Sequence, residues 1–391
     1  MSSTVLENRA DRKAYIVTGP TSGIGRRTAL ELAKHGTVVL VGRHREKLAE
    51  VQKTIEQKGQ YAISVVCDLS DPASVRRAAA EIIALHLPIA GLLNNAGIMQ
   101  MRPTKNTLGW DMTFATNHLG SFALTEALVP HLPDGANVLF VVSAVEDPER
   151  KPAKLAGFRG GRYICAEASA RGEWKSGGSA KPGFDAYATP KQGNLATVMV
   201  LARETPRLHF NAIEPGLNPT TGLGGGDVGA FVRFLQTHII PLLVPLLMRF
   251  IKILSTPKLS ARVITNTLNP RPLLHLEGAA VLIVSLLSYH WSHGSWLQFA
   301  LLFLLPDLSM LGYAANIRMG AITYNAVHTY VGPLVLAGYS FGSNCPALVS
   351  LSLVWIAHIG LDRMLGFGLK YPTRFNDTHL NPDRHTLSIG N

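Results

Sequence analysis

The chain has 391 residues, more than one ordinary domain, and its 37 Lys and Arg against 26 Asp and Glu give a formal net charge of +11. No run of Lys and Arg interleaved with aromatic residues and no zinc-finger or RNP pattern occurs, so we do not expect a nucleic-acid partner. The charge is better explained by a cytoplasmic face next to anionic lipid. The three cysteines are far apart and specify neither a disulfide framework nor a zinc site, which indicates a reducing compartment. The polar residues 1–12 lack the apolar core of a signal peptide, so we expect the first domain to stay on the side where it is made.

The composition changes once along the chain, near residue 270. Before that point strand-like and helix-like patterns alternate, which is typical of a doubly wound parallel sheet. After it, charged residues nearly disappear until Asp362. We therefore predict an α/β Rossmann domain over residues 1–270, an all-α four-helix transmembrane domain over residues 271–380 and a polar C-terminal tail over residues 381–391.

A glycine-rich stretch, residues 18–25, lies between a buried-strand pattern at 14–17 and a helical pattern at 27–33. Glycines let backbone N–H groups and the helix N-terminus approach a pyrophosphate closely. Glycine spacing alone is weak evidence, but the strand before it and the helix after it favour a nucleotide site. The residues predicted to bind the dinucleotide here are Gly19, Thr21, Ser22, Gly23, Ile24 and Gly25.

The second strand pattern, residues 37–42, is followed by Arg43, at the place where dinucleotide folds meet the adenosine ribose. An acidic residue there binds a free 2′-hydroxyl, whereas a guanidinium binds a 2′-phosphate, so NADP(H) is favoured over NAD(H). The alternative is that Arg43 only marks a solvated helix N-terminus. Further strand patterns at 62–69 and 89–93 bring Asp68 and residues 94–97 to the same edge of the sheet.

Together these motifs resemble the short-chain dehydrogenase/reductase family over roughly residues 12–268, in particular its retinol-dehydrogenase and WW-domain-oxidoreductase-like branch. The motifs are Thr18-Gly-x-x-x-Gly23-Ile-Gly25, Asp68-Leu69, Asn94-Asn95-Ala96-Gly97, Asn117-His118-Leu119-Gly120, Ser143, Tyr187-x-x-x-Lys191 and Pro215-Gly216. The resemblance implies that Asp68 contacts the adenine and that the substrate is an apolar alcohol or carbonyl. Besides the glycine loop and Arg43, the cofactor-binding residues it implies are Asp68, Leu69, Asn95, Ala96, Gly97, Tyr187, Lys191, Pro215 and Gly216.

Hydride transfer to a carbonyl needs a proton donor at the oxygen, and a tyrosine suits this role when its pKa, normally about 10, is lowered. A nearby lysine ammonium and an oxidised nicotinamide would stabilise the phenolate. Tyr187 and Lys191 are four residues apart on one helix face, a spacing that taken alone usually marks a surface pair. The family resemblance implies that Tyr187 is the proton donor, that Ser143 binds the substrate oxygen and that Asn117 holds a water linking Lys191 to solvent.

Three features depart from the family pattern. Pro190 precedes Lys191 where the family normally has a serine, and a proline inside a helix removes a hydrogen bond and can kink it. The long connection between Ser143 and Tyr187 has loop composition over residues 171–183, typical of a lid or of a surface excursion. No last strand is recognisable before the apolar C-terminal region, so we expect six strands.

Residues 231–251 form an apolar segment where the family places its substrate lid, and by the same resemblance Thr220 or Thr221 binds the nicotinamide carboxamide. Pro241 and Pro245 interrupt this segment, which has arginines near its ends. We interpret it as a lid lying against the bilayer. An ordinary buried helix and a fifth transmembrane helix are the alternatives.

Four apolar stretches follow, at residues 274–289, 296–313, 321–339 and 347–361. Each approaches the length needed to cross about 30 Å of hydrocarbon, and aromatic residues lie near their ends. Lys and Arg occur before the first stretch, between the second and third and after the fourth, but not in the other two connections. We therefore predict a multi-pass membrane protein with both termini and the reductase domain on the cytoplasmic side. A buried helical bundle in a soluble protein is the alternative.

This region resembles a family of small four-helix membrane proteins of uncharacterised function, through residues 306–313, 324–330 and 358–371. Ionisable groups inside a membrane are costly, so Asp307, His328 and His358 indicate a functional site or a paired polar network. Asp362 and Arg363 are expected to form an interfacial ion pair. Three dispersed ligands without an i, i+4 histidine pair are poor support for a metal, and no metal site is predicted.

The leading hypothesis is a membrane-bound oxidoreductase that transfers a hydride between NADP(H) and a lipophilic alcohol or carbonyl. Its chemistry would use Asn117, Ser143, Tyr187 and Lys191, and its partners would be a small lipophilic substrate and the lipid bilayer. One alternative is a non-enzymatic dinucleotide sensor that regulates a membrane partner, with Pro190 disrupting the catalytic geometry. The other is a reductase coupled to a catalytic or transporting membrane bundle.

Overall fold

The structure is a computed structural model that describes residues 12–218, 244, 254–269, 271–343, 345–370 and 378. The chain divides into two compact units, Met1–Leu268 and Asn269–Asn391. Thr220, Thr221, nearly all of the segment 231–251 and the tail 381–391 lie outside the described residues.

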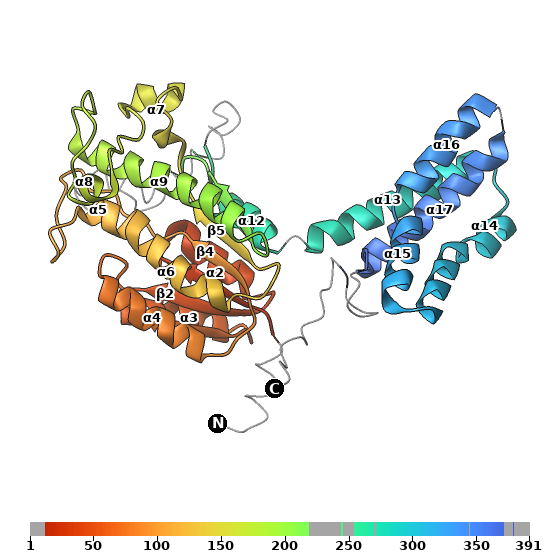
Figure 1. The fold of residues 1–391 in the computed structure, drawn as a ribbon, viewed down its shortest axis with the longest axis horizontal. Helices are drawn as coiled ribbons and strands as arrows, with labels where there is room; N and C mark the ends of the chain where they lie inside the picture. Colours follow the sequence, from red (N-terminus) through yellow and green to blue (C-terminus); the bar gives the residue numbers. More distant parts are fainter. Residues whose placement is uncertain are drawn as a thin grey trace. The chain divides into compact units, whose positions relative to one another are not determined.

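A six-stranded parallel sheet forms the centre of the first unit, with the strand order β3-β2-β1-β4-β5-β6 (Figure 1). The strands are β1 (Ala14–Thr18), β2 (Thr37–Gly42), β3 (Ala62–Val66), β4 (Ile89–Asn94), β5 (Asn137–Val141) and β6 (His209–Ile213). Val17 of β1 lies opposite Leu40 of β2 and Leu93 of β4, so the strand order reverses at β1. The predicted six-stranded doubly wound fold is confirmed for the described residues, and the reversal places a ligand crevice beyond the carboxyl ends of β1 and β4.

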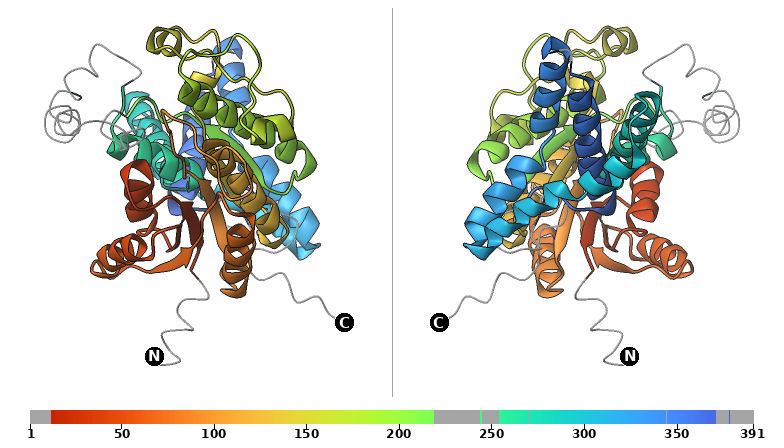
Figure 2. Two further views of the ribbon diagram at one scale, coloured as in Figure 1. Left: turned by 90° about the vertical axis from the view of Figure 1, so that its left-hand side faces the viewer. Right: turned by 90° about the vertical axis from the view of Figure 1, so that its right-hand side faces the viewer.

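Helices cover both faces of this sheet (Figure 2). One apolar core lies under α4 (Pro72–Ala84), α6 (Gly120–Leu128) and α9 (Pro182–Glu204), and the other lies under α2 (Gly23–Leu32), α3 (Arg45–Glu56) and α12 (Pro257–Leu268). Because both faces are buried, the central strands are continuously apolar, as in β1, which is buried along its whole length. Shorter helical turns connect these elements: α5 (Met112–Phe114), η1 (Ala115–Leu119), η2 (Val129–His131), η3 (Ala144–Glu146), α7 (Lys151–Ala156) and α8 (Ala166–Ala170).

The second unit is helical. Its elements are α13 (Arg271–Trp291), α14 (Trp296–Leu302), the 3₁₀ helix η6 (Leu305–Ala314), α15 (Ile317–Val327), α16 (Val331–Ser343) and α17 (Pro346–Leu365). Helices α13 and α17 approach closely at two glycines. A Cβ atom on Gly278 would lie 2.5 Å from the Met364 nitrogen, and one on Gly360 would lie 2.8 Å from the Leu282 nitrogen. Small residues at a helix contact are typical of helices that pack in a membrane.

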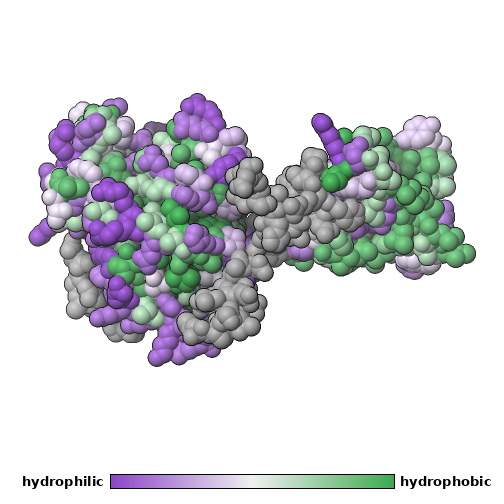
Figure 3. Space-filling view, turned by 60° about the horizontal axis from the view of Figure 1, so that its bottom comes forward, coloured by the Kyte–Doolittle hydropathy of each residue, from purple (hydrophilic) through white to green (hydrophobic). Residues whose placement is uncertain are grey.

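Three helical segments of this unit are long and apolar enough to cross a membrane: Leu273–Trp291, Trp296–Ala314 and Ala347–Leu365. Only 17%, 6% and 33% of their most apolar windows are buried within the chain, and Leu301 and Leu311 are 72% and 71% exposed. The space-filling view shows this largely hydrophobic surface (Figure 3). Soluble proteins rarely expose contiguous apolar surface of this extent, so the second unit is suited to membrane association.

The remaining stretch that was predicted to span the membrane, residues 321–339, forms two helices. Helix α15 ends at Val327 and α16 begins at Val331, with His328 between them. Pro333 lies in the first turn of α16, where its missing N–H is tolerated. In one continuous helix its ring would clash with the carbonyl of residue 329, which explains the break.

Candidate active site

The glycine loop after β1 has the geometry of a phosphate cradle. Gly19 and Gly23 adopt φ values of +66° and +53°, which favour glycine. A Cβ atom on Gly25 would lie 2.2 Å from the Gly19 oxygen and 2.4 Å from Asn95 Nδ2. The Ser22 side chain makes no capping hydrogen bond to α2, so the first-turn N–H groups are available to an anion. These residues fit the pyrophosphate of a dinucleotide.

Hydrogen bonds join the ends of β1 and β4 at the reversal of strand order. Thr18 Oγ1 accepts from the Asn95 nitrogen at 2.9 Å and from the Ala96 nitrogen at 3.0 Å. Asn95 Nδ2 donates to the Thr18 carbonyl at 2.9 Å. The predicted cofactor residues Asn95 and Ala96 are therefore held beside the glycine loop, and Gly97 lies next to Asn117.

The other predicted cofactor residues lie just beyond their strands. The Asp68 carboxylate accepts hydrogen bonds from the Ser70 nitrogen at 2.9 Å and the Ser70 hydroxyl at 2.7 Å. The Leu69 carbonyl oxygen lies against Gly120, where a Cβ atom would be only 2.0 Å from it. Arg43 is exposed directly after β2, and its Nε donates to His44 Nε2 at 3.0 Å.

Beyond β6, the Pro215–Gly216 turn is held by α12. The Ser260 hydroxyl donates to the Pro215 carbonyl at 2.8 Å, and Gly216 has a φ of +75°. The turn therefore has fixed backbone geometry at the same edge of the sheet as the glycine loop.

Ser143, Tyr187 and Lys191 meet beyond β5. Ser143 follows that strand, and its side chain lies next to Tyr187 of α9 and lowers the pKa of that phenol. Lys191, one turn further along α9, donates from Nζ to the Val141 carbonyl at 2.7 Å and lies 5.7 Å from the centre of the Tyr187 ring. Tyr187 is 8% exposed and Lys191 is 4% exposed. Because both are buried, they are not a solvated surface pair of a helix.

Burial sets the ionisation of this pair. It raises the pKa of Tyr187 to about 12, although the neighbouring Ser143 side chain acts in the opposite direction. It lowers the pKa of Lys191 to about 8. The expected acidification of the phenol by Lys191 therefore needs a correction, because burial dominates the pKa of Tyr187 and the group that lowers this pKa is Ser143. At neutral pH Tyr187 is a protonated phenol beside a lysine that is mostly charged.

Asn117 lies within η1, a π-helical turn of the kind often found at functional sites. Its side chain makes two hydrogen bonds with Ile98, accepting from the backbone nitrogen at 2.8 Å and donating to the carbonyl at 2.8 Å. Its own carbonyl accepts a hydrogen bond from Asn194 Nδ2 at 2.9 Å. Asn194 lies one turn beyond Lys191 on α9, a neighbour that the sequence did not single out. A water held by Asn117 stays a prediction.

Helix α9 continues through Pro190, so Tyr187 and Lys191 remain on one helix. The excursion between Ser143 and α9 folds over the start of that helix. The Arg162 nitrogen donates to Thr189 Oγ1 at 3.0 Å, and Phe158 stacks on Phe184 at 4.2 Å and lies 6.5 Å from Tyr187. Phe158 therefore gives the site an apolar wall next to the phenol. Sequence reasoning missed it because a loop position carries no periodic signal.

A glycine phosphate cradle and a Ser-Tyr-Lys group on a doubly wound sheet define a dinucleotide-dependent oxidoreductase. Residues 13–151 match the family model for short chain dehydrogenase. The chain is 31% identical over 239 residues to a short-chain dehydrogenase/reductase of Armillaria gallica, covering 59% of this chain and 68% of that protein. The chain belongs to the short-chain dehydrogenase/reductase family.

Two further similarities concern the first unit, and one concerns the second unit. Human retinol dehydrogenase 13 is 39% identical over 127 residues, which are 32% of this chain and 38% of that protein. A crystal structure of a short chain dehydrogenase from Burkholderia cenocepacia J2315 in complex with NADP is 23% identical with a TM-score of 0.46, covering 67% of this chain and 92% of that chain. Residues 271–382 match a family described as a domain of unknown function (DUF4260).

Proposed function

We propose that the chain is a membrane-bound oxidoreductase that transfers a hydride between NADP(H) and a lipophilic alcohol or carbonyl. The observation that carries this proposal is the buried Tyr187, which lies next to Ser143 and one helical turn from the buried Lys191. A bound nicotinamide dinucleotide supplies or accepts the hydride. Tyr187 transfers a proton at the substrate oxygen, and Ser143 donates a hydrogen bond to that oxygen and orients it.

Lys191 and Phe158 support this chemistry in different ways. The Lys191 ammonium, fixed by the Val141 carbonyl, holds positive charge near the phenol at neutral pH. Phe158 helps exclude water from the reacting oxygen, which strengthens the electrostatic interactions inside the site.

The lipophilic substrate and the membrane are supported by separate observations. Human retinol dehydrogenase 13, one of the relatives, is by its name an enzyme of an apolar alcohol. The three exposed apolar helical segments suit a bilayer, from which such a substrate is available. The positions of Lys and Arg between the apolar stretches support a cytoplasmic reductase unit.

NADPH oxidation by the detergent-solubilised full chain, measured against lipid aldehydes, ketones and retinoids, tests the proposal. We expect turnover of apolar carbonyls by protein that stays in the membrane fraction after an alkaline carbonate wash. NADPH binding without turnover on any of these substrates would favour the sensor alternative, and release of the protein by carbonate would refute its integral membrane character.

Replacing Arg43 by glutamate should change the dinucleotide preference. Arg43 is exposed at the end of β2, and a hydrogen bond between charged groups contributes about 1.5–3 kcal/mol. We therefore expect the affinity for NADPH to fall about tenfold to a hundredfold, with a much smaller effect on NADH, in a fluorescence titration. Lys53→Glu, an equal charge change in the last turn of α3, is the matched control. Equal losses of NADPH affinity in the two variants would show a non-local charge effect and exclude a contact with the 2′-phosphate.

A further inference from the structure

Four side chains from three separate segments of the helical unit meet at one point. Asp307 comes from η6, His328 follows α15, and His358 and Asp362 lie one turn apart on α17. One ligand atom from each lies within 4.8 Å of all the others. The two histidines are 3% and 2% exposed, and their Nε2 atoms face each other at 3.2 Å. The sequence indicated three of these residues as dispersed ligands, whereas the fold brings them together with a fourth.

The distances between these ligand atoms match the distances between neighbouring ligands of a single metal ion. His328 Nε2 lies 3.5 Å from Asp307 Oδ1 and 3.5 Å from Asp362 Oδ2. His358 Nε2 lies 3.5 Å from Asp307 Oδ1 and 3.9 Å from Asp362 Oδ2. Four ligand atoms arranged tetrahedrally at about 2.0–2.2 Å from a Zn²⁺ ion are roughly 3.3–3.6 Å from one another.

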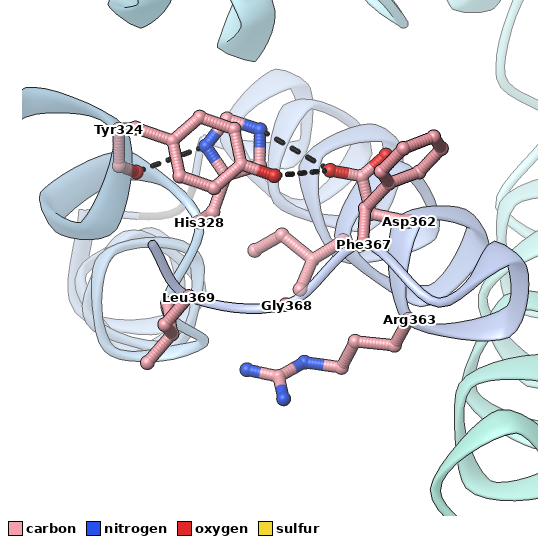
Figure 4. A pocket seen from close by; sticks show the side chains of 8 residues that line it. Tyr324, His328, Asp362, Arg363, Phe367, Gly368 and Leu369 are labelled. Carbon is pink, nitrogen blue, oxygen red and sulfur yellow. Dashed lines mark hydrogen bonds and ion pairs between the residues drawn. The ribbon is translucent and has the colours of Figure 1, made fainter. Parts of the chain in front are cut away.

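The hydrogen bonds outside the cluster orient the ligands. His328 Nδ1 lies 2.9 Å from the Tyr324 carbonyl, which can only accept, so Nδ1 carries the proton and the Nε2 lone pair of the neutral ring points into the cluster. The Tyr324 hydroxyl donates to Asp362 Oδ2 at 2.9 Å, and its ring stacks on His328 at 3.7 Å. Such outer partners commonly fix the ligands of a metal. Figure 4 shows Tyr324, His328 and Asp362 converging at the edge of a small pocket.

Asp362 turns toward the histidines and not toward Arg363, which corrects the expected ion pair. Consecutive helix residues face different directions, and the Arg363 guanidinium instead lies 5.1 Å from the centre of the Tyr330 ring. The cluster therefore combines two carboxyl side chains with two imidazoles. A divalent cation at its centre would offset the repulsion between the carboxylates in this partly buried place.

We propose that Asp307, His328, His358 and Asp362 bind a divalent transition-metal ion, with Zn²⁺ as the first choice. Two imidazoles favour a first-row transition metal over Mg²⁺ or Ca²⁺, which prefer all-oxygen shells. Asp307 and His358 belong to two of the segments long and apolar enough to span a membrane, where ionisable groups are retained chiefly for function. The proposal is independent of the reductase chemistry, because every ligand lies in the second unit.

Metal analysis of the purified full chain tests this site. We expect one transition-metal ion per chain in the wild type, its loss in His358→Ala and in Asp307→Asn, and its retention in His290→Ala, an exposed histidine of α13. Wild-type protein gives a measurement that does not depend on the folding of any variant. After chelation, added Co²⁺ should produce the visible absorption of a four-coordinate ion, and added Zn²⁺ should raise the melting temperature.

Two results would overturn the proposal. One is chelated wild-type chain that takes up none of Zn²⁺, Co²⁺, Mn²⁺ and Fe²⁺ and shows no change in melting temperature. The other is equal metal content in the wild type and in a folded His358→Ala variant. In either case the four residues are a hydrogen-bonded network without an ion.

Tyr324→Phe separates a positioning role from a ligand role. The change keeps the ring on His328 but removes the hydrogen bond to Asp362. Loss of an outer-shell partner typically lowers metal affinity 10–100-fold, so we expect Zn²⁺ to bind more weakly in a competition titration, still one ion per chain. Tyr339→Phe, at an exposed tyrosine of α16, should leave the affinity unchanged. Unaltered affinity in Tyr324→Phe would exclude the positioning role.

Discussion

Replacing Tyr187 by phenylalanine should lower the proposed NADPH-dependent carbonyl reduction by about a hundredfold to ten-thousandfold, the range that general acid catalysis contributes. The expected loss is in kcat, because the phenylalanine ring fills the same buried space and only the hydroxyl group is removed. Burial raises the pKa of Tyr187 to about 12, so the wild-type phenol is a proton donor over the whole physiological pH range. Single-turnover kinetics with saturating NADPH measures the effect.

The matched control is Tyr61→Phe, a tyrosine directly before β3 and thus at the opposite edge of the sheet from the crevice. NADPH binding, followed by fluorescence, should be nearly the same in both variants and in the wild type. Wild-type turnover in Tyr187→Phe would remove this residue from the mechanism. Loss of NADPH binding together with turnover would instead indicate that the substitution disturbed the cofactor site.

The sequence predicted the first unit well because its signals are local. The apolar strands β1 and β2 and the glycine loop between β1 and α2 form from neighbouring residues, and a strand buried on both faces needs a continuous apolar run. That Ser143, Tyr187 and Lys191 share a site was implied by the resemblance to the short-chain dehydrogenase/reductase family, which rests on the ordered set of motifs. What the sequence could not supply was the wall at Phe158 or the bond from Asn194 to Asn117, since both arise where distant segments pack.

The second unit shows where pattern reasoning fails. Hydropathy counts apolar residues but not backbone breaks, so residues 321–339 looked like one span although Pro333 makes two helices of them. The i, i+4 spacing of His358 and Asp362 was visible in the sequence. It was overlooked because Asp362 was paired with its neighbour Arg363, and only the fold brings Asp307 and His328 to the same point.

Replacing Lys191 by methionine is expected to inactivate the enzyme and to stabilise it at the same time. Methionine fills similar space without the ammonium, whose burial lowers the pKa of Lys191 from 10.5 to about 8. At about 1.36 kcal/mol per pH unit, keeping that buried amine charged at neutral pH costs about 3 kcal/mol of folding free energy. Loss of the charged hydrogen bond to Val141 offsets roughly half of this. We expect a net gain of about 1–2 kcal/mol at pH 7, and a loss of turnover of at least about a hundredfold.

The pH dependence of unfolding distinguishes this explanation from simple repacking. Below pH 8 both the folded and the unfolded wild-type chains hold the Lys191 proton, and the full penalty is present. Between about pH 8 and 10.5 the unfolded chain holds more protons, so wild-type stability rises with pH and the advantage of Lys191→Met disappears. Calorimetry between pH 7 and 10 measures this stability difference on the unfolding transition that shifts when NADPH is added. Lys53→Met, a change at an exposed lysine, is the control. A stability difference that did not change with pH would mean that the charge of Lys191 carries no folding penalty. A residue kept for catalysis is expected to lower the folding stability. That result would show that Lys191 does not lower it.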